Sequence, residues 1–255
     1  MSTAGRKAWY LKVDAAPAAA VLVGDRGRVL VAAELLDGAA LLNEDRGLTT
    51  VVGQWRGVDV IVSAFGMGAP IAAIVMHELA AVGSTCFVRA GTMMTRRPPL
   101  GTFIVAERAL IHEGTSATYG NLAAAVDLDT DLTSALADAC ANGAIARGTV
   151  ASCDGFYTQM TDLLAAPPPA LIERWDAEQV IGLDMETSAL ASVAAALGVA
   201  FGSLCLATVD VDGPSMLDAR RREAGEAALL RAALDVATTR APGATRSPAA
   251  EGERP

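Results

Sequence analysis

Apolar runs short enough for strands alternate along this chain with segments that favour helices. Buried strands are predicted at residues 18–23, 48–55, 58–64, 85–89, 102–106 and 148–153. Helices are predicted at residues 29–36, 70–82, 131–142, 170–179 and 218–239. This alternation predicts the α/β class, as a three-layer α/β/α sandwich with a mixed central sheet.

The stretch from residue 180 to residue 212 combines an uncharged interior with acidic side chains at its two ends. The 23 residues between Glu186 and Asp210 carry no charge, and the 21 residues 189–209 match a membrane span in length. Gly198 and Gly202 interrupt this segment, which favours a buried helix, a tight turn and a central strand instead. A helix followed by a returning strand would bring both carboxylates to one sheet edge, where open α/β folds bind ligands.

Length and composition are typical of a single soluble domain. The 255 residues suffice for one large core, so we predict one domain over residues 1–240 and a disordered tail over residues 241–255. The net charge of −9 disfavours nucleic acid and anionic membranes as partners. The four cysteines form no CxxC motif, only two histidines are present, and residues 1–14 lack a signal-peptide core. We therefore predict a cytoplasmic protein with free thiols and no metal site.

Glycine and arginine follow three of the predicted strands, where they could bind an oxyanion. These residues are Gly24 and Arg28, Gly66 and Gly68, and Arg89, Gly91 and Thr92. Glycine allows the backbone to approach an anion closely, and arginine matches phosphate oxygens with a planar pair of donors. Each feature also has a purely structural interpretation: a Gly-x-Gly before a helix is commonly a tight turn, and Arg89 could pair with a core carboxylate.

Four motifs occur in a characteristic order and spacing, namely GDRGR, FGMGAP, VRAGT and DMETSAL. With them, residues from about 10 to 234 resemble the nucleoside phosphorylase family, which includes uridine phosphorylase and hexameric bacterial purine nucleoside phosphorylase. The RAGT and DMET elements are the specific ones, whereas the glycine motifs alone would be weak. The resemblance implies that a nucleoside reacts with phosphate to give free base and ribose 1-phosphate.

The resemblance also implies roles for individual positions. The implied phosphate ligands are Gly24, Arg28, Arg89 and Thr92, with Arg46 lent to the neighbouring subunit. The implied ribose-binding residues are Tyr10, Met185 and Glu186, and the implied base-binding residues are Phe156, Met94 and Gln159. Asp210 lies where purine-specific members place their general acid, so it is the candidate catalytic residue. No metal or organic cofactor is implied, and phosphate is the co-substrate.

Several positions depart from the family's patterns and leave the substrate open. The segment after Phe156 retains Gln159 but has no arginine to recognise a uracil edge. Asp212 is a second candidate for the acid. Tyr10 replaces a histidine that family members direct at the ribose 5′-hydroxyl. This change predicts better tolerance of a 5′-deoxy sugar, and the alternative is that Tyr10 only packs at a subunit interface. Arg26 replaces the proline of the first motif.

Three functions are compatible with these residues. A phosphorylase is favoured, because hydrolases of this family usually lose the phosphate arginines, whereas Arg28, Arg46 and Arg89 are present. The alternatives are a hydrolytic nucleosidase and a non-catalytic nucleoside-binding protein. Because Arg46 is expected to complete a neighbour's site, we predict a homo-oligomer, with a dimer as the minimal unit and a hexamer as the expected state.

Overall fold

The computed structural model describes residues 8–141, 143–157, 168–211, 213 and 215–242. Its strands are β1 (Ala19–Val23), β2 (Asp37–Asn43), β3 (Thr50–Trp55), β4 (Val58–Ala64), β5 (Cys86–Thr95), β6 (Phe103–His112), β7 (Ala125–Asp127), β8 (Ile145–Cys153), β9 (Gly182–Asp184) and β10 (Ala200–Asp210). Its helices are α1 (Arg26–Leu35), α2 (Ala69–Ala81), α3 (Thr115–Thr118), α4 (Thr130–Ala139), α5 (Pro169–Ala177), α6 (Thr187–Leu197) and α7 (Ala219–Arg240), with a short 3-10 turn at Asp45–Gly47.

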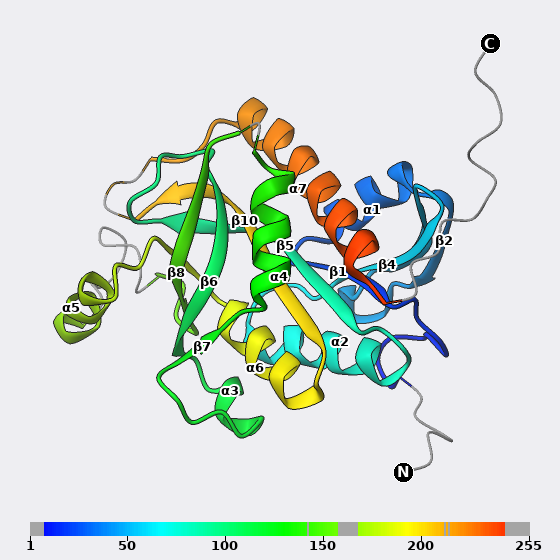
Figure 1. The fold of residues 1–255 in the computed structure, drawn as a ribbon, viewed down its shortest axis with the longest axis horizontal. Helices are drawn as coiled ribbons and strands as arrows, with labels where there is room; N and C mark the ends of the chain where they lie inside the picture. The colour runs from blue at the N-terminus through cyan, green and yellow to red at the C-terminus, as the bar shows by residue number, and fades with distance from the viewer. Residues whose placement is uncertain (1–7, 142, 158–167, 212, 214, 243–255) are drawn as a thin grey trace.

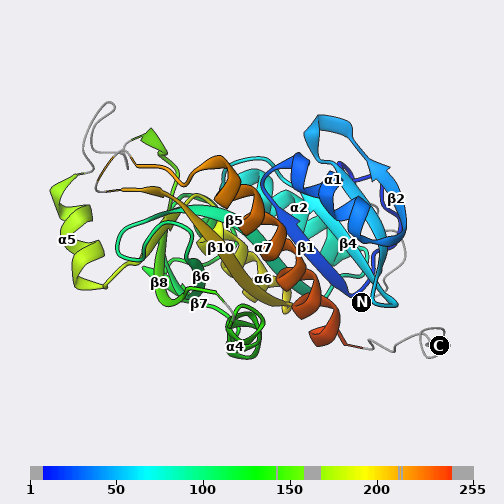
Figure 2. The ribbon, with the colours of Figure 1, turned by 90° about the horizontal axis from the view of Figure 1, so that it is seen from above.

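Helices cover both faces of one central sheet, as Figures 1 and 2 show. Helices α1, α4 and α7 pack on one face, over a core that includes Val21 and Leu229. Helices α2 and α6 pack on the other face, over a second core that includes Leu22 and Leu190. Val21 and Leu22 enter different cores because successive side chains of a strand point to opposite faces. The predicted three-layer α/β/α sandwich is therefore confirmed.

The sheet is mixed and partly closed. Its strand order within the described residues is β10-β6-β8-β9-β5-β1-β4-β3-β2, with β7 attached to β6. β1 pairs in parallel with β4 and β5, and β5 pairs in parallel with β10, so the carboxyl ends of these four strands share one edge. β5 pairs with β9 as well as β10, which closes β5, β9, β8, β6 and β10 into a ring.

The uncharged stretch folds as the sequence predicts. α6 ends at Leu197, Gly198 takes the left-handed conformation with φ 70°, and β10 begins at Ala200. Residues 187–194 of α6 and 201–208 of β10 are buried, which explains why these stretches carry no charge. Among the described residues, the structure contains no helix with both the length and the apolar character needed to cross a membrane.

Strand β5 is longer than predicted. The sequence analysis ends this strand at Arg89 and places Gly91 and Thr92 in a loop, but β5 continues to Thr95. It does so because β10 pairs with it along the whole length and β9 pairs with its last residues, and these ladder bonds outweigh the local turn preference of Gly-Thr. Gly91 is needed in β5 for space rather than for a turn, since a Cβ there would lie 2.7 Å from Nη1 of Arg89.

Other differences concern short or exposed elements. α1 begins at Arg26, so Arg28 lies in its first turn rather than in a loop. The sequence analysis misses β2, β7, β9 and α3. β2 is an edge strand that pairs only with β3, and its first five residues are exposed, so it lacks the alternation that marks a half-buried strand. Residues 243–255 of the predicted tail lie outside the described residues, whereas Ala241 packs against the first core.

Candidate functional site

A cavity of about 370 Å³ and a larger one of about 630 Å³ are found among the described residues, and the larger one lies at the shared carboxyl edge of the parallel strands. Most of the residues that the sequence analysis predicts for the site line this larger cavity. Its lining includes Gly24, Arg28, Arg46, Arg89, Thr92, Met94, Phe156, Met185 and Glu186. These residues lie in or just after β1, β5, β8 and β9, in the first turn of α1 and in the 3-10 turn, so the fold unites positions that are up to 162 residues apart.

Three residues that the sequence analysis predicts for the site are not part of this lining. Tyr10 lies beside it, with its ring centroid 5.1 Å from Cζ of Arg46. Asp210 is the last residue of β10 and is half-buried, directly after Val209, which does line the cavity. Gln159 lies outside the described residues. The roles assigned to these three residues, like those assigned to the lining residues, remain predictions.

Arg89 is the central cation of the cavity. Its side chain is 4 % exposed, and its terminal nitrogens lie 2.9 Å from Oδ2 of Asp184 and 2.7 Å from Oε2 of Glu186. The nearby carboxylates and the Cys205 sulfur raise the pKa of Arg89 above its usual value, against the opposing effect of burial. The guanidinium therefore stays charged at every accessible pH, and it fixes the positions of two buried carboxylates.

Asp184 joins Arg89 to a buried network of hydrogen bonds. Its carboxylate accepts a bond of 2.6 Å from the Ser152 hydroxyl and bonds from the hydroxyl and the amide of Thr187. The carboxylate thereby caps the start of α6, where backbone N–H groups lack helical partners. The sequence analysis assigns no role to Asp184, although it is the first residue of the DMET motif. Its structural role is to hold Arg89 and to anchor the α6 N-terminus.

Glu186 lies at the mouth of α6 and faces the cavity. The Gly68 amide donates to its Oε1 at 2.7 Å, and Nη2 of Arg89 donates to its Oε2 at 2.7 Å. Burial raises the pKa of Glu186, and the Arg89 charge and the Gly68 amide oppose this effect. Because each carboxylate oxygen has two lone pairs, both oxygens can still accept a bond from a ligand hydroxyl.

The other parts of the cavity differ in chemistry. The lining includes the cations Arg28 and Arg89 together with Gly24 and Gly66, where no side chain blocks the approach of an oxyanion, although the Gly66 amide itself donates to the Gly24 carbonyl at 3.0 Å. Other residues of the lining are apolar, namely Met93, Met94, Phe156, Leu183, Val209 and Met216. A β-bulge between Ala207 and Val209 lets the neighbours Thr208 and Val209 both reach the cavity. An anion, a pair of hydroxyls and a flat apolar group could thus be bound side by side.

Arginines missed by the sequence analysis also border the cavity. Arg26 and Arg222 both line it, although only Arg26 was noted, as a replacement for a proline. Arg222 lies on α7 and forms an ion pair of 2.8 Å with Glu226, one turn further on. Its position depends on how α7 crosses the sheet, so the local sequence gives no signal for it. Within the described part of the chain, no cluster of three or more metal-ligating side chains is present.

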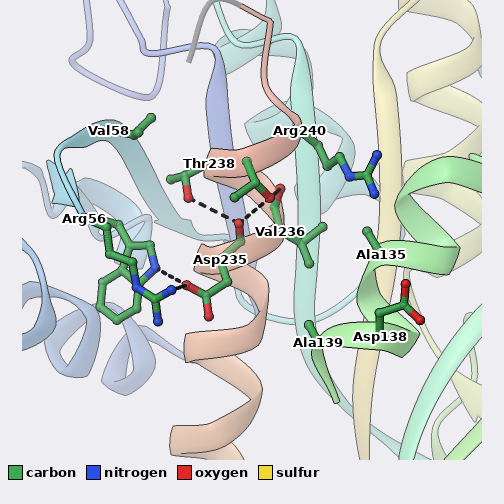
Figure 3. Close-up of a pocket in the computed structure, with 11 residues that line it drawn as sticks. Arg56, Val58, Ala135, Asp138, Ala139, Asp235, Val236, Thr238 and Arg240 are labelled. Atoms are coloured by element: carbon green, nitrogen blue, oxygen red, sulfur yellow. Dashed lines mark hydrogen bonds and ion pairs between the residues drawn. The ribbon is translucent and has the colours of Figure 1, made fainter. Parts of the chain in front are cut away.

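The smaller cavity, of about 370 Å³, lies away from these residues, between the β3–β4 hairpin, α4 and the end of α7. Figure 3 shows that Arg56 and Asp235 face each other at its edge. The Asp235 carboxylate accepts from the Trp55 indole at 2.7 Å and pairs with Arg56 at 3.1 Å. Asp235 thus binds both Trp55 and Arg56, and these contacts join the hairpin to α7 at this cavity.

We expect Asp235→Ala to lower the free energy of unfolding by about 1 to 3 kcal/mol, because the buried indole N–H would lose its acceptor. Urea denaturation of the variant and of wild type measures this difference. The matched control is Asp138→Ala, on the α4 side of the same cavity, where the carboxylate is exposed. Its effect should stay within about 0.5 kcal/mol. Equal effects of the two substitutions would contradict the structural role of Asp235.

The fold and the cavity agree with a comparison of the sequence with known families. Residues 18–238 match the family described as the phosphorylase superfamily. The chain therefore belongs to the phosphorylase superfamily, within its nucleoside phosphorylase branch of pentosyltransferases. This result confirms the resemblance based on the GDRGR, FGMGAP, VRAGT and DMETSAL motifs.

Individual relatives carry more specific names. The chain is 29% identical over 195 residues to guanosine phosphorylase of Halorubrum lacusprofundi, a match that covers 75% of this chain and 77% of the relative. It is 30% identical over 193 residues to uridine phosphorylase of Escherichia coli, covering 72% and 76% of the two chains. The crystal structure of uridine phosphorylase from Vibrio fischeri superposes with a TM-score of 0.80 at 27% identity, covering 92% of this chain and 99% of that one.

Proposed function

We propose that the protein is a nucleoside phosphorylase that cleaves the N-glycosidic bond of a nucleoside with inorganic phosphate. The observation that carries this proposal is the joint placement of Arg28, Arg89 and Glu186 in one cavity with an apolar region. The arginines suit phosphate, the carboxylate suits the ribose hydroxyls, and the apolar region suits a base. A hydrolytic nucleosidase would need no anion at the arginines, so these residues favour phosphorolysis.

The chemistry follows from the separation of charge in the transition state. As the bond between ribose C1′ and the base nitrogen breaks, its electron pair goes to the base and positive charge develops on the sugar. Phosphate held by the arginines stabilises this charge, and one of its oxygens then bonds to C1′ to give ribose 1-phosphate. The leaving base gains a proton, which general acid catalysis by Asp210 would supply. No metal or organic cofactor is required in this scheme.

The base that we propose is a purine, because an acid at Asp210 suits a developing charge on purine N7. One relative is named guanosine phosphorylase, which is compatible with this choice, while others are named uridine phosphorylases. A panel of guanosine, inosine, adenosine, uridine and cytidine, assayed for base release with phosphate present, tests the proposal. Faster turnover of uridine than of every purine nucleoside would overturn the purine assignment.

Asp210→Asn is expected to slow the chemical step by at least about tenfold, which corresponds to about 1.4 kcal/mol. Single-turnover kinetics with a good substrate of the panel measures this step directly. Asp131→Asn, an exposed change on α4, serves as the matched control. If Asp210→Asn is unimpaired while Asp212→Asn is inactive, then Asp212 is the acid.

The proposal also covers assembly and location. Arg46 borders the cavity and contacts Tyr10, and its role toward a neighbouring subunit remains a prediction. We propose a homo-oligomer, with a dimer as the minimal active unit and a hexamer as the full assembly. Light scattering coupled to an activity assay tests this, and a fully active monomer would refute it. The four free, buried cysteines fit a reducing cytoplasm.

A further inference from the structure

Glu226 connects two arginines at the edge of the large cavity. It lies on α7, and its side chain is 20% exposed. Its Oε2 is 3.3 Å from Nε of Arg28, and its Oε1 is 2.8 Å from Nε of Arg222. Arg28 and Glu226 are 198 residues apart, so this contact ties the first turn of α1 to α7. The two arginines therefore lie side by side, held by one carboxylate.

The charges around Arg28 and Arg89 favour a further cation from the same chain, since Arg46, which also lines the cavity, is predicted to serve the site of a neighbouring subunit. Arg28 and Arg89 contact three carboxylates between them, those of Glu226, Asp184 and Glu186. Two positive charges that are paired with three negative ones do not favour a dianion, since an opposite charge must outweigh the like charges nearby. Arg222 is the cation that is joined directly to this group, through Glu226.

The contacts of Glu226 with Arg28 and Arg222 leave some guanidinium N–H groups available to a ligand. Arg28 uses Nε for Glu226 and Nη1 for the Ala90 carbonyl, at 3.2 Å. Arg222 uses Nε for Glu226, and within the described part of the chain its two terminal nitrogens have no hydrogen-bond partner. Arg222 also lines the cavity, and its side chain is 43% exposed, so a ligand can reach these nitrogens.

We propose that Arg222 is an additional anion-binding residue of this cavity, and that Glu226 is a positioning residue that holds it beside Arg28. The ligand is inorganic phosphate or the phosphate group of a sugar phosphate, and this choice rests on the proposed function. The terminal nitrogens of Arg222 bind the anion from the α7 side of the cavity. Glu226 offsets the repulsion between the two guanidinium groups when the anion is absent.

The experiment compares Arg222→Ala with Arg220→Ala, which removes an exposed arginine from the same helix two residues earlier. Isothermal titration with inorganic phosphate measures binding without turnover. We expect Arg222→Ala to weaken phosphate binding by about tenfold or more, the effect of losing a charged hydrogen bond. Arg222→Lys should recover part of the loss, and Arg220→Ala should bind as wild type does.

The role of Glu226 is tested with Glu226→Gln, and Glu223→Gln, an exposed change one turn earlier, is its control. Steady-state kinetics separates the effects on the two substrates. A positioning role predicts a raised KM for phosphate with an unchanged KM for the nucleoside, whereas a merely structural role would change both or lower the melting temperature alone. The control should change neither constant.

The outcomes distinguish this inference from the proposed function. If wild type binds phosphate, loses it on Arg222→Ala and yet releases no base from any nucleoside, the inference holds and the proposed function fails. If Arg222→Ala binds phosphate as wild type does, the inference is wrong whatever the activity. A variant that raises only the KM of the nucleoside would also overturn it, since Arg222 would then contact the nucleoside. Absence of phosphate binding by wild type would contradict both.

Discussion

Arg89→Ala is expected to reduce turnover by a factor of about 10² to 10³ or more and to destabilise the folded protein. Arg89 contacts both Asp184 and Glu186 and lines the cavity beside the predicted phosphate ligands. Removal of one preorganised hydrogen-bond donor to a charge that develops in the transition state typically lowers kcat by a factor of that size. Removal of one member of a buried ion pair also leaves uncompensated charge, which costs about 3 to 5 kcal/mol.

The stability loss in Arg89→Ala should depend on pH with a defined sign. Burial already raises the pKa of Glu186 in the folded protein, and Arg89 opposes this effect, so the substitution will raise that pKa further. A carboxyl group with a raised folded pKa contributes stability that is fully present below the unfolded pKa, near about 4.3, and is lost as the pH rises through the folded value. The variant should therefore be less destabilised at pH 5 than at pH 8.

Urea denaturation at both pH values measures this stability difference. Arg97→Ala is the matched control, because it removes an exposed arginine just beyond the end of β5. The control should retain the stability and turnover of wild type. If Arg89→Ala is equally destabilised at both pH values, or keeps more than a tenth of the wild-type turnover, then Arg89 does not have the central role described here.

Glu186→Ala is expected to reduce kcat/KM by about 10² or more. The carboxylate is held by Gly68 and Arg89 at 2.7 Å each, and its remaining lone pairs face the cavity. A charged hydrogen bond contributes about 1.5 to 3 kcal/mol, and two ribose hydroxyls would make two such bonds. Since 1.4 kcal/mol corresponds to a tenfold change, the loss of both hydrogen bonds should lower kcat/KM by much more than tenfold.

Comparison of a ribonucleoside with its 2′-deoxy analogue separates hydroxyl binding from a general structural effect. Wild type should prefer the ribonucleoside, and Glu186→Ala should lose most of this preference because the acceptor is gone. Glu178→Ala, an exposed change at the end of α5, should leave the preference intact. An unchanged preference in Glu186→Ala would show that another residue binds the hydroxyls.

The sequence was sufficient to predict the layers of the fold and most of the cavity. Gly24, Arg28 and Arg89 are recognisable because they occur in short motifs just after or within apolar strands, and parallel strands place such positions at one edge. Glu186 is recognisable for a similar reason, as a carboxylate at the start of an uncharged helix. Local patterns of this kind predict which residues meet when the topology is simple.

Other features depend on contacts between distant segments. Arg222 reaches the cavity only because α7 crosses the sheet beside α1, and nothing in residues 218–226 indicates that contact. The role of Asp184 follows from its bonds to Ser152 and Arg89, which come from two other strands. The extension of β5 to Thr95 follows from its pairing with β9 and β10. Tertiary pairing of this kind overrides the local preference on which a sequence prediction relies.

The most direct test of the central claim is the identity of the sugar product when purified protein is supplied with the best nucleoside of the panel and inorganic phosphate. Phosphorus NMR follows ribose 1-phosphate, and base release is measured in parallel with phosphate and in phosphate-free buffer. The account predicts ribose 1-phosphate in an amount equal to the released base, and no base release without phosphate. Equal rates of base release in both buffers, with free ribose as the product, would contradict the account and identify a hydrolase.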